Sequence, residues 1–493
     1  MNPSSIRDSM AAVREDTTMD PFTSATETVR ALRGREIGAL ELLEEKLARI
    51  ERFNGKLNAI IWSDFERARE EARAFDAAPE QRRGRLAGLP MTVKESFNLA
   101  GAPTTWGMPL LKDNIASCDS VVVERLRRSG AIVLGKTNVP LALGDLQSYN
   151  EIYGSTGNPW DTSRTPGGSS GGAAAALASG MVPLEVGSDI GGSIRNPAHY
   201  CGVFGHKPTW GLIPVRGHSL PGAVAEPDIA VVGPLARSAA DLDLALDVLA
   251  GPDELDAGVQ YRLPRFRGTP HLRVAVWAND AMAPVAAAVE GRVRHVARLL
   301  EERGASVDDA ARPDFTSEHT GRLYRALLMG FLGGVQPPPV YAEFAKQAAA
   351  LDPGDQSEAA EWLRAQTISH HVWLGLHNER AQLRWAWHRF FQDYDLLVTP
   401  ICATSAFLRD EGPMGERRID VDGQEQNHYL QMFWAGLSGL PELPSTIVPT
   451  GPGADGLPIG VQLIGPAWGD RVTIGAAAAL EAAGCGFQAP PGY

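Results

Sequence analysis

The sequence predicts an α/β protein with a parallel or mixed sheet and helices on both of its faces. In the middle of the chain, short apolar runs alternate with amphipathic segments, which is the rhythm of βαβ units. The 52 glycines and 35 prolines are spread along all 493 residues and indicate many turns and crossovers. This length allows one large domain or two to three smaller ones. No linker divides the chain cleanly, so we expect a single large domain.

The first elements are helical. Residues 24–75 read as helices, and "LELLEEKLARIERF" (40–53) has apolar residues at i, i+3, i+4 and i+7. The short apolar run "LPMTVKES" (89–96) then predicts a strand. "SVVVERLRRSG" (120–130) predicts a helix that ends at its glycine, and "AIVLGKT" (131–137) predicts the strand that follows it.

The central elements continue this alternation. The alanine-rich "SSGGAAAALASG" (169–180) predicts a helix capped by Ser169 or Ser170. "VPLEVGSD" (182–189) predicts a strand, and "IGGSIRNPA" (190–198) a tight turn into a helix. In "ARSAADLDLALDVLAG" (236–251), a serine three residues before an aspartate imitates a capping box, and the final glycine ends the helix.

The C-terminal half is less regular. Residues 252–270 look like a connection. Residues 310–380 show the least regular secondary-structure pattern, so we expect a variable insertion there. The remaining predicted elements are strands at 272–277, 394–400, 445–451 and 459–465, and helices at 285–304 and 471–484.

Composition excludes several classes of protein. The chain has 46 basic and 59 acidic residues, a net charge of −13 and no long Lys/Arg run, which argues against nucleic acid or an anionic membrane as partner. Its four cysteines lie far apart, so we expect no disulfide framework or zinc ribbon. The first 20 residues lack the apolar region of a secretory signal, and no apolar run reaches about 18 residues. We therefore expect a cytoplasmic protein without a membrane span.

The stretch "TPGGSSGG" (165–172) has two conventional interpretations. Residues 167–171 match the G-x-S-x-G nucleophile elbow, which would make Ser169 the nucleophile of a Ser-His-Asp enzyme. An elbow follows a buried strand, however, and the preceding "NPWDTSRTP" has no strand pattern. None of the eleven histidines has a distinguishing context. A phosphate-binding loop is disfavoured because no Gly-Lys-Ser/Thr follows the glycines.

The stretch "GSDIGGSIRNP" (187–197) predicts a different nucleophile. Ser193 lies between a predicted strand and a predicted helix, after two glycines that permit a tight turn and close approach of a ligand. Four backbone N–H groups there can converge on one spot and hold a developing oxyanion. They belong to Ile190, Gly191, Gly192 and Ser193.

A serine nucleophile needs a base, and a neutral lysine is one. Lys94 lies on an apolar predicted strand, and burial lowers the pKa of a lysine by disfavouring its charged form. Ser169 can then relay a proton between Lys94 and Ser193. We expect Asp189 and Arg195 to brace the loop by hydrogen bonds, and Ser170 to cap the following helix rather than to react.

The motifs "GLPMTVKESF", "TPGGSSGGAAAALASGMVPLEVGSDIGGSIRNPAHYCGVFGHKPTWG" and "LPIGVQLIG" resemble the amidase signature family, most closely over residues 80–250. Lys94, Ser169 and Ser193 match that family's Ser-Ser-Lys triad in order and in spacing. The resemblance implies that Ser193 is the nucleophile, that Ser169 bridges through an unusual cis peptide, and that Lys94 is the base. It also implies an oxyanion hole from Ile190 to Ser193.

The resemblance further implies a single α/β/α domain around a large, mixed and mostly parallel sheet, with no metal or organic cofactor. Its expected segments are a helical N-terminal part (1–75), the signature core (76–250), a variable helical region that lines the substrate pocket (251–390) and C-terminal elements that complete the domain (391–493).

The expected substrate is a small amide or carbamate with an apolar or aromatic group, such as an anilide or aryl acylamide, and esters should react too. Leu143, Gly144 and Leu146 would flank the acyl entrance, and "YRALLMGFLGGVQPPPVY" (324–341) would supply an apolar wall. One alternative is the glutaminase subunit of a tRNA-dependent amidotransferase. Another is a catalytically silent binding protein. Whether the chain forms a homodimer is left open.

Overall fold

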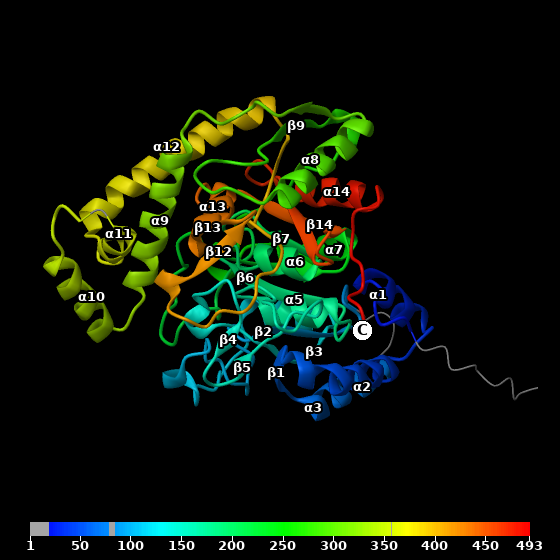
Figure 1. Cartoon of the computed structure of the whole chain (residues 1–493). Helices are drawn as coiled ribbons and strands as arrows, with labels where there is room; N and C mark the ends of the chain where they lie inside the picture. The colour runs from blue at the N-terminus through cyan, green and yellow to red at the C-terminus, as the bar shows by residue number, and fades with distance from the viewer. Residues whose placement is uncertain (1–18, 78–83, 356) are drawn as a thin grey trace, which may run out of the picture.

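The computed structural model describes residues 19–77, 84–355 and 357–493, and Figure 1 shows their arrangement. Residues 1–18, for which we expected no secretory signal, lie outside these ranges. Eight strands form one large sheet in the order β10-β9-β11-β15-β14-β7-β8-β6. Their bounds in chain order are β6 (Leu184–Asp189), β7 (Phe204–Lys207), β8 (Val231–Ala236), β9 (Arg273–Val276), β10 (Ser306–Asp308), β11 (Leu396–Thr399), β14 (Ser445–Pro452) and β15 (Pro458–Ile464).

The large sheet is mixed, as predicted, but it is not mostly parallel. Parallel pairing is confined to β10, β9 and β11, and every other neighbouring pair in it is antiparallel. For β14 and β15 the reason is local, because a short turn joins the two strands, and such a connection allows only antiparallel pairing.

A second sheet of three strands lies beside the first, with order β1-β3-β2. Its strands are β1 (Ile60–Ser63), β2 (Pro90–Lys94) and β3 (Ile132–Thr137). Strand β1 corrects the prediction that residues 24–75 are all helical, because this short apolar run pairs with β3 instead. Strand β2 packs against β6, the edge strand of the large sheet, and its last residue is Lys94.

Helices cover both faces of the large sheet, as expected. Strand residues alternate between two cores: Val274 and Val276 face one cluster, and Ala275 faces another. The first layer contains α1 (Ala25–Gly34), α4 (Val121–Arg128), α7 (Ala239–Leu249), α8 (Ala287–Glu302) and α14 (Asp470–Glu481). The opposite layer contains α5 (Gly171–Ala178), α6 (Arg195–Cys201) and α13 (Met432–Gly439). Helices α2 (Ala39–Leu57) and α3 (Phe65–Asp76) cover the small sheet.

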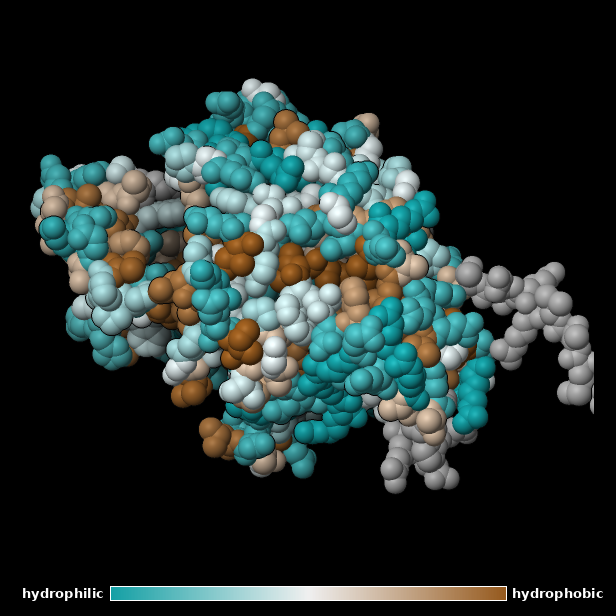
Figure 2. Space-filling model, turned by 90° about the horizontal axis from the view of Figure 1, so that it is seen from below, coloured by the Kyte–Doolittle hydropathy of each residue, from teal (hydrophilic) through white to brown (hydrophobic). Residues whose placement is uncertain are grey.

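The poorly readable region 310–380 folds into helices that project from the sheet core at the left of Figure 1. They are α9 (Ser317–Gly334), α10 (Pro338–Ala350), α11 (Glu358–Ala365) and α12 (His370–Asp393). Helix α9 packs against both α12 and α13, which ties this helical arm to the core. Figure 2 shows apolar side chains among hydrophilic ones on the arm, and the exposed ones include Val340 and Val372.

Two short hairpins complete the fold, β4 (Tyr149–Asn150) with β5 (Gly154–Ser155) and β12 (Arg418–Val421) with β13 (Gln424–Asn427). The capping box predicted for α7 is only half formed. Ser238 Oγ accepts the Asp241 N–H at 3.1 Å, but the Asp241 carboxylate accepts the N–H groups of Ala25 and Thr26 and so caps α1. Within the described part of the chain, every helix is too short or too polar to cross a bilayer.

Candidate active site

Lys94 ends strand β2 in the packed region between the two sheets, where its side chain is completely buried. Its Nζ lies 2.6 Å from Ser169 Oγ and 2.9 Å from Ser188 Oγ. Burial lowers the pKa of Lys94 to about 7, and the nearby carboxylates of Asp189 and Glu95 offset only part of this shift. A substantial fraction of Lys94 is therefore neutral near pH 7, which is the form that can accept a proton.

Ser169 lies in a loop that is held tightly on several sides. The peptide bond between Gly168 and Ser169 is cis, as the family resemblance implied. A Cβ on Gly168 would meet the carbonyl oxygens of Asp145 and Gln147, so only glycine fits there. No strand lies within residues 156–170, all of which are described, so the loop lacks the structure of a nucleophile elbow.

Asn196 joins this loop to the turn that carries Ser193. Its Oδ1 accepts the Gly168 N–H at 3.0 Å, while its Nδ2 donates to the carbonyl oxygens of Gly168 at 2.5 Å and Gly192 at 2.9 Å. The Ser170 N–H also donates to the Ser193 carbonyl at 3.1 Å. Asn196 was not among the predicted site residues, although it lies three residues after the predicted nucleophile, in the stretch "SIRNP".

The turn between β6 and α6 carries Ser193, which is 6% exposed and lines a pocket. Its hydroxyl forms no hydrogen bond with Ser169 in the described structure. Among the described residues, the N–H groups of Ile190, Gly191 and Ser193 donate to no protein acceptor. The Gly192 N–H donates to Asp189 Oδ1 at 2.9 Å. The expectation of four converging donors is therefore wrong for Gly192, because the carboxylate already binds its N–H group.

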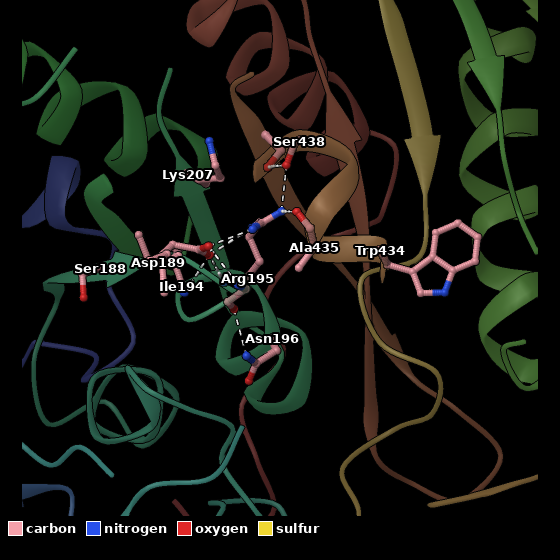
Figure 3. A network of polar contacts seen from close by, with 12 residues as sticks. Ser188, Asp189, Ile194, Arg195, Asn196, Lys207, Trp434, Ala435 and Ser438 are labelled. Atoms are coloured by element: carbon pink, nitrogen blue, oxygen red, sulfur yellow. Dashed lines mark hydrogen bonds and ion pairs between the residues drawn. The ribbon is translucent and has the colours of Figure 1, made fainter. Parts of the chain in front are cut away.

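A buried ion pair fixes the same turn (Figure 3). Arg195 Nη2 lies 2.7 Å from Asp189 Oδ1, and neither side chain is exposed. Burial would raise the pKa of Asp189, but Arg195 and the backbone N–H of Ile194 lower it to about 2. Arg195 Nη1 donates to Ala435 O, Ser438 Oγ and Gln462 Oε1, which connects the turn to α13 and β15. Asp189 and Arg195 thus brace the loop.

Ser170 occupies the position before α5, but its side chain does not cap that helix. Its hydroxyl donates to the Ser188 carbonyl at 3.3 Å and accepts the Ser188 N–H at 3.4 Å. The expected capping role is wrong, because the hydroxyl points to β6 rather than along the helix. It links the serine loop to the strand that carries Ser188, the second partner of Lys94.

A pocket of about 630 Å³ opens in front of Ser193, Ile190 and Gly191. The residues expected at the acyl entrance, Leu143, Gly144 and Leu146, all line it. Three residues of the segment expected to supply an apolar wall (324–341) line the pocket, namely Leu328, Met329 and Leu332. Helix α11, outside that segment, adds Ala359, Trp362 and Leu363.

Two charged residues line this pocket, Asp145 and Arg418. Asp145 is buried and forms an ion pair with Arg417, with 2.6 Å between Asp145 Oδ2 and Arg417 Nη1. Arg417 therefore balances the charge of Asp145 through Oδ2, while Asp145 Oδ1 has no hydrogen-bond partner among the described residues. The remaining lining is mainly aliphatic, aromatic and methionine side chains, which suit an apolar group.

The comparisons with known proteins agree with this geometry. The family model described as Amidase matches residues 41–474. The chain belongs to the amidase signature family. A glutamyl-tRNA(Gln) amidotransferase subunit from Anaeromyxobacter dehalogenans (strain 2CP-C) is 34% identical over 483 residues, covering 93% of this chain and 95% of that protein. A solved bacterial aryl acylamidase of the amidase signature family is 28% identical, with a TM-score of 0.78 over 94% of this chain and 96% of that one.

Another solved structure comes from a vestigial protein complex that bears on the evolutionary origins of an s-triazine catabolic enzyme. It is 30% identical, with a TM-score of 0.79 over 94% of this chain and 100% of that chain. As a member of the amidase signature family, the chain is a hydrolytic enzyme that acts on amides, and the silent binding protein is no longer a supported alternative. The family does not by itself assign the roles of Lys94, Ser169 and Ser193, nor the substrate.

Proposed function

We propose that this chain hydrolyses amides with an apolar or aromatic group through an acyl-enzyme on Ser193. The observation that carries the proposal is the buried Lys94, whose amine lies 2.6 Å from Ser169 Oγ and whose pKa is lowered to about 7. A buried neutral amine next to a serine hydroxyl is a general base. Ser193, the proposed nucleophile, lines a pocket with mainly apolar side chains.

In the proposed reaction, neutral Lys94 takes the proton of the Ser169 hydroxyl, and Ser169 takes that of Ser193. The Ser193 oxygen attacks the acyl carbon as its side chain rotates toward Ser169. The N–H groups of Ile190, Gly191 and Ser193 stabilise the tetrahedral oxyanion. Ser169 then protonates the leaving amine nitrogen, the C–N bond breaks, and Lys94 returns a proton to Ser169. Water attacks the acyl-enzyme by the reverse route.

The pocket supports an apolar substrate over free glutamine. Glutamine at neutral pH carries an ammonium and a carboxylate, and a buried charge requires an opposite charge beside it. Arg418 can pair with a carboxylate, but Asp145 is already paired with Arg417. The likeness to amidotransferase subunits still makes the glutaminase role the second candidate. That candidate predicts turnover of glutamine and binding of further proteins of an amidotransferase complex.

The test compares initial rates at about pH 8 with an aromatic or apolar nitroanilide and with glutamine. Ser193→Ala should abolish anilide turnover, and Ser163→Ala is the matched control because that serine is exposed and its hydroxyl bonds only to Asp161. A carbamate or fluorophosphonate should label the wild type at Ser193, as peptide mass spectrometry reports. Unchanged turnover or labelling in Ser193→Ala would contradict the nucleophile, and turnover of glutamine alone would favour the amidotransferase role.

A further inference from the structure

A tyrosine of the helical arm contacts the turn in which the three free N–H groups lie. Tyr324, in α9, donates its hydroxyl to the Ile190 carbonyl oxygen at 2.8 Å, although the two residues are 134 positions apart. Ile190 directly precedes Gly191, and both line the pocket together with Ser193. The contact therefore acts on the peptide unit between Ile190 and Gly191.

The planarity of that peptide unit couples the Tyr324 hydrogen bond to the direction of the Gly191 N–H. A peptide unit is planar, and in the trans form its C=O and N–H bonds point in opposite directions. The Ile190–Gly191 bond is not among the cis peptides of the described chain. When Tyr324 holds the Ile190 carbonyl on one side, the Gly191 N–H must point to the other side. Rotation of this plane would require breaking the Tyr324 hydrogen bond.

Tyr324 is itself held rigidly. Its side chain is 1% exposed, and it packs against α13, where Gly436 and Gly439 leave room for the ring. A Cβ on Gly436 would lie 2.6 Å from the Cδ1 atom of that ring. Burial raises the pKa of the Tyr324 hydroxyl above its ordinary value, so this group stays protonated and remains a donor near neutral pH.

The same helix also forms part of the substrate pocket. Leu328 lies one turn after Tyr324 on α9, and both Leu328 and Met329 line the pocket wall. One rigid element thus holds the turn from behind and contacts the apolar part of the pocket. The position of α9 determines both where the substrate lies and where the Gly191 N–H points.

We propose that Tyr324 is a positioning residue of the oxyanion hole, which orients the Gly191 N–H through its hydrogen bond to the Ile190 carbonyl. The inference rests on the proposed acyl transfer at Ser193. Removing the hydroxyl leaves a donor that is free to rotate away from the oxyanion. Removing the Tyr324 hydroxyl should weaken stabilisation of the transition state rather than binding of the substrate, because the substrate carbonyl carries little charge before attack.

The test is Tyr324→Phe, which keeps the ring. We expect kcat for the nitroanilide to fall roughly 10- to 100-fold with little change in KM, since deleting an oxyanion donor outright costs about 100- to 1,000-fold. The inhibition constant of an aryl trifluoromethyl ketone, whose adduct carries an oxyanion, should rise by a similar factor. Binding of the carboxylic acid product should not change. Tyr394→Phe is the control, because its hydroxyl bonds to Asp308 and not to the turn.

An unchanged kcat, or a rise in KM alone, would overturn the inference. If Tyr324→Phe does not fold, Gly436→Ala tests it in another way, since the added methyl displaces the ring while the hydroxyl is kept. That variant should also weaken binding of the trifluoromethyl ketone more than binding of the acid, and equal weakening of both would contradict the inference. The two proposals fail separately: activity in Ser193→Ala contradicts the acyl transfer, whereas full activity in Tyr324→Phe contradicts only the positioning role.

Discussion

Lys94 Nζ lies 2.6 Å from Ser169 Oγ and 2.9 Å from Ser188 Oγ, in a site closed to solvent. The two serines come from different structures, a loop before α5 and the end of β6. They fix the amine between them, and the apolar surroundings keep its pKa near neutrality. The arrangement places a buried amine beside a hydroxyl that can pass on its proton.

Ser169→Ala should impair amide hydrolysis much more than ester hydrolysis. An amine leaves only after protonation, whereas an alkoxide or phenoxide leaves more easily, so the proposed proton donor matters most for the amide. We expect the ratio of ester to anilide turnover to rise by roughly 10-fold or more, within the effect of one general acid. Matched nitrophenyl ester and nitroanilide substrates measure this ratio. Equal losses for both would remove Ser169 from the proton path.

Activity should increase with pH and reach a plateau above about pH 7. The reactive form of Lys94 is neutral, and its pKa is lowered to about 7, so protonation removes the base as the pH falls below that value. A profile of kcat/KM between pH 5 and 9 measures this loss of activity at low pH. A plateau that extends down to pH 5 would show that another group is the base.

Lys94→Met should stabilise the fold while it abolishes activity. The folded pKa of Lys94, about 7, lies below its ordinary value of 10.5, so the unfolded chain binds the proton more tightly. Wild-type stability is therefore lost as the pH falls from about 10 to 7 and no further below 7. The gain of the variant in free energy of unfolding should grow over that window and then stay constant. Chemical denaturation at several pH values measures it, and a gain independent of pH would contradict the linkage.

Leu332→Glu should raise KM for a substrate with a large apolar group by roughly tenfold, because a charge in the wall must be desolvated when that group binds. Leu332 lines the pocket from α9. Val335→Glu is the matched control, since Val335 follows the same helix, is 41% exposed and does not line the pocket. KM for an acetanilide, whose acyl group is small, should rise less. Equal effects of both variants would contradict the assigned wall.

Gly172→Ala should destabilise the fold by about 2 kcal/mol or more, the cost of overpacking a tight interior. A Cβ at Gly172 would meet the backbone of Asn138 and Ala59, where helix α5 approaches the small sheet. Gly291→Ala is the control in an exposed part of α8, where no atom lies within 4 Å, and it should stabilise by about 0.5–1 kcal/mol. Thermal and urea unfolding measure both. Similar small effects of both variants would contradict tight packing between the start of α5 and the small sheet.

Much of the fold was predictable because its signals are local. Periodicity located α2, α4, α7 and α8, and short apolar runs located β2, β3, β6 and β9. The direction in which neighbouring strands pair was not predicted correctly. Whether two strands pair parallel or antiparallel depends on how the chain returns, so the antiparallel partners of β14 escaped a prediction based on βαβ rhythm. Strand β1 was missed because four residues carry too little pattern.

By itself, the sequence determined the family, the amide chemistry and the candidate residues Lys94, Ser169 and Ser193, because the glycine-rich motifs require close backbone packing and have a fixed order. The tertiary structure decided how those residues are supported. It placed Ser188 on Lys94, Asn196 on the serine loop and Tyr324 on the Ile190 carbonyl. Most of these contacts join segments far apart along the chain, and all depend on which way each side chain points. No local pattern specifies them; they arise only when the helices, sheets and turns are packed together.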